Sequence, residues 1–139
     1  MEAGYEPIAD DEIIYRRIPV STGWYDPDSQ ELAPEAFGPR KDDISGISVS
    51  RAKYKTIEQA AQGRPGKSYY VAILLAGDIR RAGMNIEPRP ELPGGIDPSH
   101  AEIIDLNAAN RKDDTTLARQ HRLVELCLEV KGPYHTADA

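Results

Sequence analysis

A chain of 139 residues, 40% hydrophobic and 29% charged, has the length and composition of one ordinary soluble domain, and its formal net charge is −6. Its longest apolar stretch, residues 71–76, is far too short to span a membrane, and its acidic first residues lack the apolar core of a signal peptide. The single cysteine, Cys127, excludes an intrachain disulfide and any multi-cysteine zinc site. We therefore expect a cytoplasmic protein without membrane contact.

The basic residues are dispersed along the chain as pairs. Two of these pairs, Arg40-Lys41 and Arg111-Lys112, are each followed at once by two aspartates. Sequence-independent binding of nucleic acid depends on clustered Lys and Arg side chains. The scattered pattern therefore disfavours nucleic acid as a partner, although a local positive cleft would escape this argument.

The N-terminal part of the chain predicts one strand followed by a long loop. Residues 12–20 are rich in β-formers and close with a proline, which ends a strand or marks a sheet edge. Residues 21–39 contain four turn signals and predict a loop, with a short helical turn after Pro34. This loop holds the only Trp and the only Phe of the chain, Trp24 and Phe37.

The middle of the chain predicts a strand, a helix and a second strand. Residues 44–50 alternate, so that Ser48 and Ser50 share the polar face of a strand. Residues 57–62 follow a threonine cap and predict a short helix that stops at a glycine. Residues 68–75 are apolar on both faces, which is typical of a strand inside a sheet.

Short elements and irregular segments alternate in the next stretch. We expect a helical turn over residues 79–82, a short strand over 84–87, a loop over 88–98 and a strand over 101–106. The polar residues 107–120 suit a helix that begins near an aspartate.

The last regular segment has two interpretations. Residues 123–130 alternate between apolar and polar side chains, which favours a half-buried strand. A helix continuing from Leu117 competes with it, because Leu117, Val124 and Leu128 also fall at helical spacing. Gly132-Pro133 is expected to end this element.

Together these elements predict an α+β fold. We expect a single compact domain over residues 1–139, with a mixed, mostly antiparallel sheet of about five or six strands and about two or three short helices. The polar ends, residues 1–11 and 133–139, are expected to be mobile.

Residues 61–68 (AQGRPGKS) match most of the phosphate-loop pattern GxxxxGK[ST], with Ala61 in place of the first glycine. That loop needs a strand before it and a helix after it, whose free N–H groups and dipole meet the phosphates. Here a predicted helix precedes the segment and a predicted strand follows it. We interpret the segment as a turn into a core strand, with Lys67 as a solvated turn residue.

Two segments carry candidate metal ligands. Residues 26–31 begin like a calcium loop but lack its central glycine and its closing glutamate. His100 and Glu102 lie two apart on a predicted strand and share a face, where they suit an acid/base pair or two metal ligands. Zinc sites use three or four ligands, and a third would have to come from a distant histidine. We expect no metal site.

Arg16 and Arg17 are neighbours on a predicted strand and therefore point to opposite faces. One of them is expected to point into the structure or along a cleft. A buried arginine must be paired, and Glu102 or Glu129 on an adjacent strand is the natural partner. Ligand binding by the second arginine is the alternative.

The order of these residues resembles that of the ADP-ribosyltransferases of the Arg-Ser-Glu type. Arg16 or Arg17 comes early, Ser48-Val49-Ser50 stands in the middle, and Glu102 or Glu129 comes late. The resemblance implies an arginine that holds NAD phosphate and a late glutamate that orients the ribose. The likeness covers isolated residues: the central motif has Val for Thr, and the late Glu-x-Glu or Gln-x-Glu pair is missing.

Two functional hypotheses follow. In the first, the protein is a small acidic module that binds a partner protein or a small ligand without catalysis or a cofactor. Aromatic residues on loops often anchor interfaces, so Trp24, Tyr25 and Phe37, with Arg17, are its expected binding residues. The alternative for the three aromatic residues is that they cover the core.

In the second hypothesis the protein is a small enzyme. Arg16, Ser48, His100 and Glu102 would form one catalytic cleft, with ADP-ribosyl transfer from NAD as its most concrete version. Arginine would contact the pyrophosphate and Glu102 would stabilise positive charge on the ribose. This hypothesis requires the four residues to converge in space.

Overall fold

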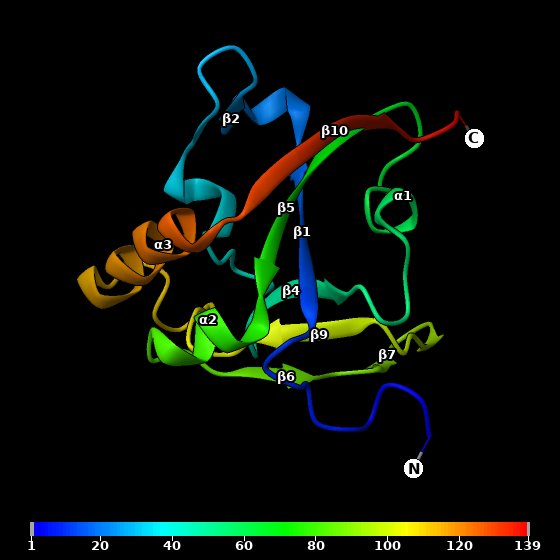
Figure 1. Cartoon of the computed structure of the whole chain (residues 1–139), viewed down its shortest axis with the longest axis vertical. Helices are drawn as coiled ribbons and strands as arrows, with labels where there is room; N and C mark the ends of the chain where they lie inside the picture. Colours follow the sequence, from blue (N-terminus) through cyan, green and yellow to red (C-terminus); the bar gives the residue numbers. More distant parts are fainter. Residues whose placement is uncertain (1, 139) are drawn as a thin grey trace.

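The computed structural model describes residues 2–138, which form one six-stranded antiparallel sheet with helices on both faces (Figure 1). The strand order is β10-β5-β1-β4-β9-β6, and the bounds are β1 Ile13–Pro19, β4 Ile47–Arg51, β5 Ser68–Leu75, β6 Ile86–Pro88, β9 His100–Ile103 and β10 Glu129–His135. The α-helices are α1 Ile57–Ala60, α2 Ala76–Arg81 and α3 Asp114–Leu126. This arrangement confirms the predicted single α+β domain.

The two predicted loops contain small elements of their own. In the first, a 3₁₀ turn at Val20–Thr22 precedes the hairpin of β2 (Tyr25–Asp26) and β3 (Glu31–Leu32). A second 3₁₀ turn, Pro34–Phe37, confirms the expected helical turn after Pro34. The second loop holds the hairpin of β7 (Glu91–Leu92) and β8 (Gly95–Ile96).

The sheet bends sharply between β1 and β4. Strand β1 pairs with β5 along its whole length, but it pairs with β4 only at Ile14–Arg51 and Tyr15–Ser50. Beyond these pairs the two strands diverge, so β10, β5 and β1 run in a different direction from β4, β9 and β6 (Figure 1). The bend leaves a hollow on one face of the sheet.

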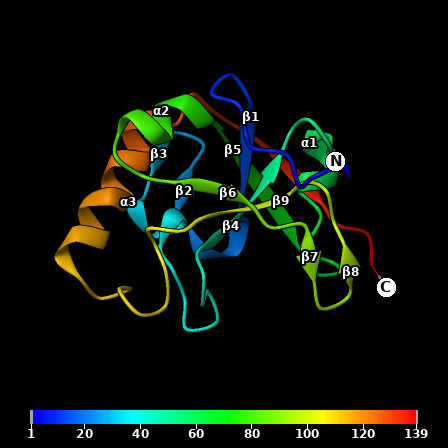
Figure 2. The ribbon, with the colours of Figure 1, turned by 90° about the horizontal axis from the view of Figure 1, so that it is seen from below.

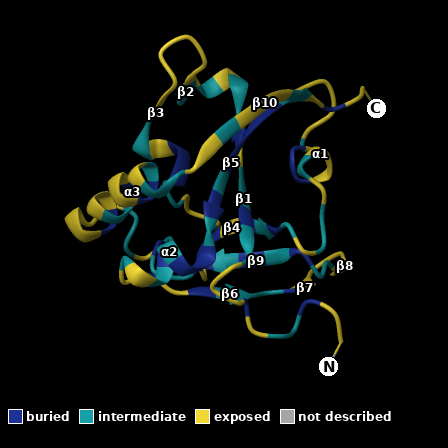
Figure 3. Ribbon diagram, viewed as in Figure 1, coloured by how far each residue is buried: buried dark blue, intermediate teal, exposed yellow. Residues whose placement is uncertain are grey.

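The other face carries the main hydrophobic core. Alternate strand residues such as Ile14, Ile18 and Leu74 point to this face and are fully buried, because they pack beneath α2, α3 and the second 3₁₀ turn. Figures 1 and 2 show α2 and α3 on this side of β1 and β5, with α1 and the β7–β8 hairpin on the opposite side. The outer surface of α3 is exposed in Figure 3.

Helix α1 covers part of the hollow face. A capping box starts it: Thr56 accepts from the backbone N–H of Gln59, whose side chain accepts from the Thr56 N–H. Tyr69 and Val71 of β5 are buried on this face. A Cβ atom at Gly63 would lie 2.3 Å from Tyr69 Cζ, so the chain after α1 approaches the Tyr69 ring as only glycine allows. Helix α1 therefore forms one wall of the hollow.

Two predictions about the C-terminal segment were wrong. We favoured a strand over residues 123–130, but α3 continues to Leu126 because Thr116, Gln120 and Leu123, at helical spacing, form its buried face. The alternating apolar and polar residues from Val124 onward pair with the sheet only from Glu129, where β10 begins. We also expected Gly132-Pro133 to end the element, whereas β10 passes a register shift there and continues to His135.

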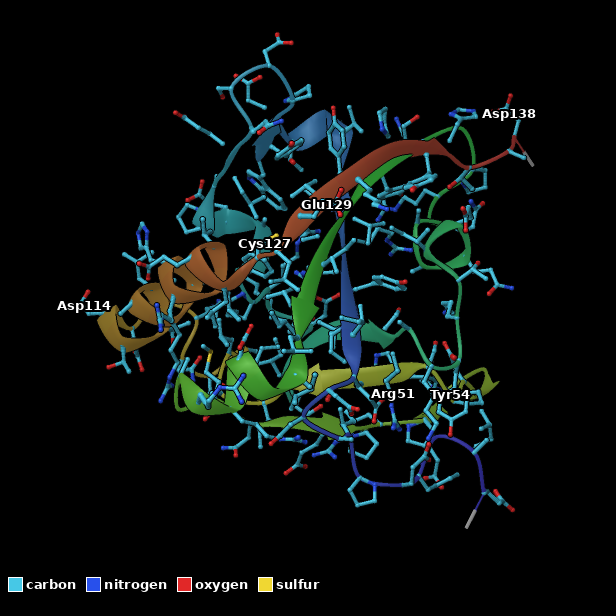
Figure 4. The ribbon with its side chains drawn as sticks, in the orientation of Figure 1. Arg51, Tyr54, Asp114, Cys127, Glu129 and Asp138 are labelled. Atoms are coloured by element: carbon cyan, nitrogen blue, oxygen red, sulfur yellow. The ribbon has the colours of Figure 1, made fainter. Side chains whose placement is uncertain are left out.

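No helix within residues 2–138 is both long and apolar enough to cross a membrane. The expected mobility of the two ends of the chain stays a prediction. In the described residues, the N-terminal segment is tied to β4 through Arg51 (Figure 4).

Candidate functional site

The hollow beside β1 and β4 is a cleft of about 890 Å³. Its floor is the side of the sheet that carries Arg17, Ser48, Ser50 and His100. Its walls come from four separate segments of the chain: residues 19–24, residues 40–43, α1 with the turn that follows it, and the β7–β8 hairpin. The cleft therefore exists only because the sheet divides between β1 and β4.

The cleft is positively charged, although the chain as a whole is acidic. Three aspartates line it, Asp42, Asp43 and Asp97. Its six basic residues are Arg16, Arg17, Arg40, Lys55, Arg64 and Lys67. Six cations against three carboxylates leave a formal charge of +3, so the rest of the chain, at a total of −6, carries −9.

Most of these cations are not neutralised by a neighbouring carboxylate. Lys55 forms an ion pair with Asp97 at 3.2 Å. Within residues 2–138, no carboxylate lies within ion-pair distance of Arg17, Arg40, Arg64 or Lys67, and all four side chains are exposed. These four residues give the cleft its capacity to attract an anion.

Two of the arginines are held by aromatic rings. The Arg17 guanidinium lies 4.9 Å from the centroid of Tyr69 and donates a hydrogen bond to the Gln62 carbonyl. The Arg40 guanidinium lies 5.7 Å from the centroid of Trp24. An arginine that is oriented by an aromatic face loses less side-chain freedom on binding a ligand.

Arg16 extends from the side of β1 opposite to Arg17, as the neighbouring positions predicted, and it also lines the cleft beyond the end of the β1–β4 ladder. Its Nε donates to the Ala36 carbonyl at 3.0 Å and its Nη1 donates to the Ser48 carbonyl at 2.8 Å. Burial lowers the pKa of Arg16 to about 10, against the opposing effect of Asp43. The hydrogen-bond partners of Arg16 are thus backbone carbonyls, and that of Ser48 lies beyond the end of the β1–β4 ladder. The expected ion pair between Arg16 or Arg17 and Glu102 or Glu129 was wrong.

Ser48 and His100 meet on the floor of the cleft. The Ser48 Oγ lies 3.2 Å from His100 Nε2, across the β4–β9 ladder. The other ring nitrogen, Nδ1, lies 2.7 Å from the Arg89 carbonyl. A carbonyl oxygen only accepts, so Nδ1 carries a hydrogen, and in that tautomer Nε2 is the nitrogen that can accept from the Ser48 hydroxyl.

Glu102 lies next to this pair without contacting it. It stands directly opposite Ser48 in the ladder, but its carboxylate accepts from Ser45 Oγ at 2.6 Å and lies 3.8 Å from Arg89. Of the four residues of the enzyme hypothesis, Arg16, Ser48 and His100 line the cleft, whereas Glu102 is not among its lining residues. Ser48 and His100 are in direct contact, Arg16 reaches the Ser48 backbone, and Glu102 is occupied by other partners.

The three loop aromatic residues have different surroundings. Trp24 is half-buried and lines the cleft. Tyr25 is half-buried against the core, with its ring 4.9 Å from that of Tyr70 in an edge-to-face contact. Phe37 is fully buried in the core. Phe37 and Tyr25 thus pack in or against the core, which was the alternative to a role in binding a partner.

The segment over residues 61–68 has the backbone order that we predicted: α1 precedes it and β5 follows it. Lys67 is exposed, but it also lines the cleft together with Arg64. Sequence reasoning missed Arg40, Lys55 and Arg64, because these residues belong to distant segments and share no spacing.

Within the described part of the chain, no three His, Cys, Asp or Glu side chains are grouped as a metal site requires.

Comparisons with family models, with curated proteins and with solved structures find no match for this chain.

Proposed function

We propose that this protein is a binding module whose cleft takes a small anionic ligand that carries phosphate or carboxylate groups. The observation that supports it is the charge of +3 inside the cleft of a chain whose total is −6. A cleft lined by one sign of charge concentrates ligands of the opposite sign and raises their association rate.

The size and shape of the cleft favour a small molecule. Its volume of about 890 Å³ lies within the range of roughly 300–1,000 Å³ that is usual for small-molecule sites. The half-buried Trp24 ring lines the cleft and provides a flat apolar surface, with the Arg40 guanidinium beside it. This combination suits a ligand with an anionic group and a planar or apolar part.

NAD is the ligand that the resemblance to ADP-ribosyltransferases implies. Two nitrogens of Arg16 already donate to the carbonyls of Ala36 and Ser48, so recognition of pyrophosphate by Arg16 would require losing these bonds. Arg17, Arg64 and Lys67 are the better candidates for contacting phosphate. NAD is therefore only one of the anionic ligands to be tested for binding.

The test uses Trp24, the only tryptophan, as an internal probe of the cleft. Pyrophosphate, citrate and NAD are each titrated by isothermal calorimetry, and pyrophosphate and citrate are also followed by Trp24 fluorescence. We expect saturable binding of at least one of them with a change in the emission of Trp24.

Arg64→Ala and Lys67→Ala should each weaken binding by about tenfold or more, because a hydrogen bond to a charged group contributes about 1.5–3 kcal/mol. Lys112→Ala removes an exposed cation outside the cleft and serves as the matched control. Equal losses in all three variants, or no saturable binding of any anion, would contradict the proposal.

A further inference from the structure

Ser48 and His100 form an arrangement that binding alone does not require: a hydroxyl in contact with an imidazole whose second nitrogen is held by a third group. We infer that Ser48 is a nucleophile for acyl transfer from an anionic ester, with His100 as its general base. The inference deepens the proposed function, on which it rests for the class of substrate.

The first requirement of such a nucleophile is an oriented base. The Arg89 carbonyl fixes the His100 ring at 2.7 Å and sets the tautomer in which Nε2 accepts from the Ser48 hydroxyl at 3.2 Å. This is the logic of an activated serine: nucleophile and base within hydrogen-bond reach, and the base oriented by a third group. Here a backbone carbonyl takes the place of the usual carboxylate.

The second requirement is access from the ligand site. Ser48 is exposed, His100 is half-buried, and both line the cationic cleft. Both side chains stand on neighbouring strands, β4 and β9, in the interior of the sheet. Rigid elements hold a reactive geometry more precisely than loops do.

A second serine–histidine contact in the same protein shows which features matter. Ser68 Oγ lies 3.1 Å from His135 Nδ1, and Ser68 also lines the cleft. Within residues 2–138, the other nitrogen of His135 makes no hydrogen bond, and the His135 side chain is exposed. Its ring is therefore not oriented as that of His100 is, which makes Ser68 an internal control for Ser48.

The reaction runs in two steps. Ser48 Oγ attacks the ester carbonyl carbon while its proton passes to His100 Nε2; the Oγ–C bond forms, the C–O bond to the alcohol breaks, and His100 returns the proton to the leaving oxygen. Water then attacks the acyl-Ser48 carbon, His100 takes its proton and delivers it to Ser48 Oγ, and a carboxylic acid is released. Ester and water are the only reactants.

The positive charge of the cleft defines the substrate class. A carboxylate or phosphate on either part of the ester would be attracted by Arg17, Arg64 and Lys67. The same charges favour the oxyanion that forms during attack on the carbonyl carbon. We therefore expect an ester with an anionic group to react faster than its neutral analogue.

The test is covalent labelling with a fluorophosphonate, in which the serine oxygen displaces fluoride from phosphorus. Intact-mass and peptide mass spectrometry report the stoichiometry and the labelled residue. We expect one adduct per chain, at Ser48. Ser48→Ala should abolish this adduct, whereas Ser29→Ala, at an exposed serine outside the cleft, should leave its rate unchanged.

His100→Ala should slow labelling by about 100-fold or more, the usual contribution of a general base. Circular dichroism checks its fold, and His100→Gln, which keeps a polar side chain without a base, replaces it if the alanine variant unfolds. Labelling at Ser68, labelling that is insensitive to both His100 variants, or no labelling of the native protein would each overturn the inference.

A pair of 4-nitrophenyl esters separates this inference from the proposed function. Hydrolysis should be faster for the hemisuccinate than for the acetate, and Lys67→Ala should reduce that preference. Saturable pyrophosphate binding without Ser48 labelling overturns the inference alone. Ser48 labelling without any anion binding or anionic preference supports the nucleophile and overturns the proposed ligand class.

Discussion

Arg51 is the residue on which the N-terminal segment depends. Its side chain is fully buried, and its Nε and Nη2 donate to the two carboxylate oxygens of Glu12, each at 2.9 Å. Nη1 donates to the Glu6 carbonyl, and Tyr54 stacks on the guanidinium (Figure 4). A buried charge is tolerated only when it is paired and hydrogen-bonded in this way. Arg51 lies on the same strand face as Ile47 and Val49, so alternation alone indicates its burial.

Arg51→Ala should lower the free energy of unfolding by about 3–5 kcal/mol, because it leaves the half-buried Glu12 carboxylate without its partner. Urea unfolding followed by circular dichroism measures the change. Lys53→Ala is the matched control: it removes a half-exposed ion pair to Glu6, which should cost no more than about 1 kcal/mol. Similar losses in the two variants would show that Arg51 is not a buried anchor.

The same cluster makes stability depend on pH. A hydrogen bond from the Tyr54 hydroxyl, with further help from Lys53 and Arg51, lowers the pKa of Glu6 from 4.5 to about 2. Burial raises the pKa of Glu12, but the hydrogen bonds from Arg51 and the Ala9 N–H, together with the charges of Arg51 and Lys53, outweigh it and the net shift of the pKa is downward. Both carboxylates bind protons more weakly in the folded state than in the unfolded state.

Their contribution to stability is therefore complete above about pH 4.5 and is lost as the pH falls towards 2. Glu6→Gln should flatten the dependence of the urea midpoint on pH in this window. Glu58→Gln changes an exposed carboxylate on α1 and should leave the dependence as it is in the native protein. An unchanged slope for Glu6→Gln would contradict the low pKa of Glu6.

At the scale of elements, α3 shows why local patterns were ambiguous. Its sequence contains both an alternating run and a helical repeat, and either would bury apolar side chains. The helix prevails because Leu123 reaches the core from it, while Gln120 donates to the Pro34 carbonyl of the second 3₁₀ turn at 3.0 Å. The choice depended on a contact with a segment 86 residues away in the chain.

Leu123→Ala should lower the free energy of unfolding by about 2–5 kcal/mol, because Leu123 is fully buried and its truncation leaves a cavity. Leu117 lies on the same helix but is 47% exposed, so Leu117→Ala should change stability by less than about 0.5 kcal/mol. Chemical unfolding of both variants measures the difference. Equal effects would contradict the helical face that the structure assigns to α3.

At the scale of the whole molecule, charge is segregated. The residues that line the cleft carry +3 and the rest of the chain −9, so the positive charge is concentrated in one region of an otherwise acidic molecule. The dispersed basic pairs in the sequence disfavoured nucleic acid, yet folding brings residues from four segments to one cleft.

Pyrophosphate binding should therefore weaken steadily as NaCl rises from about 0.05 to about 0.5 M, because exposed charges are screened over a Debye length of about 8 Å at 0.15 M salt. Calorimetry at several salt concentrations measures the slope. Arg64→Ala should make the slope shallower, and Lys112→Ala should not. A salt-independent affinity would mean that the cleft binds by contacts other than charge.

The sequence by itself determined the class of fold and most of its parts. Strands formed within residues 12–20 and over 68–75 as predicted, because alternation and β-branched or aromatic side chains are local properties of a pleated element. The strand predicted over 44–50 begins only at Ile47 and runs to Arg51. It also determined that residues 61–68 link a helix to a strand, since the Thr56 cap specifies where the helix begins. The helix ends at Ala60, with Ala61 as its C-cap, before the predicted glycine stop.

Only the tertiary structure decided where the sheet divides, and therefore where the cleft lies. The end of the β1–β4 ladder after Tyr15–Ser50 is a property of two strands some 35 residues apart, and no local pattern encodes it. The gathering of Arg40, Arg64 and Lys67 around the cleft depends on that division. The contact between Ser48 and His100 depends on the pairing of β4 with β9, which the tertiary structure also decided. Charges and catalytic pairs act through distances of a few ångströms, which chain spacing does not specify until the fold is complete.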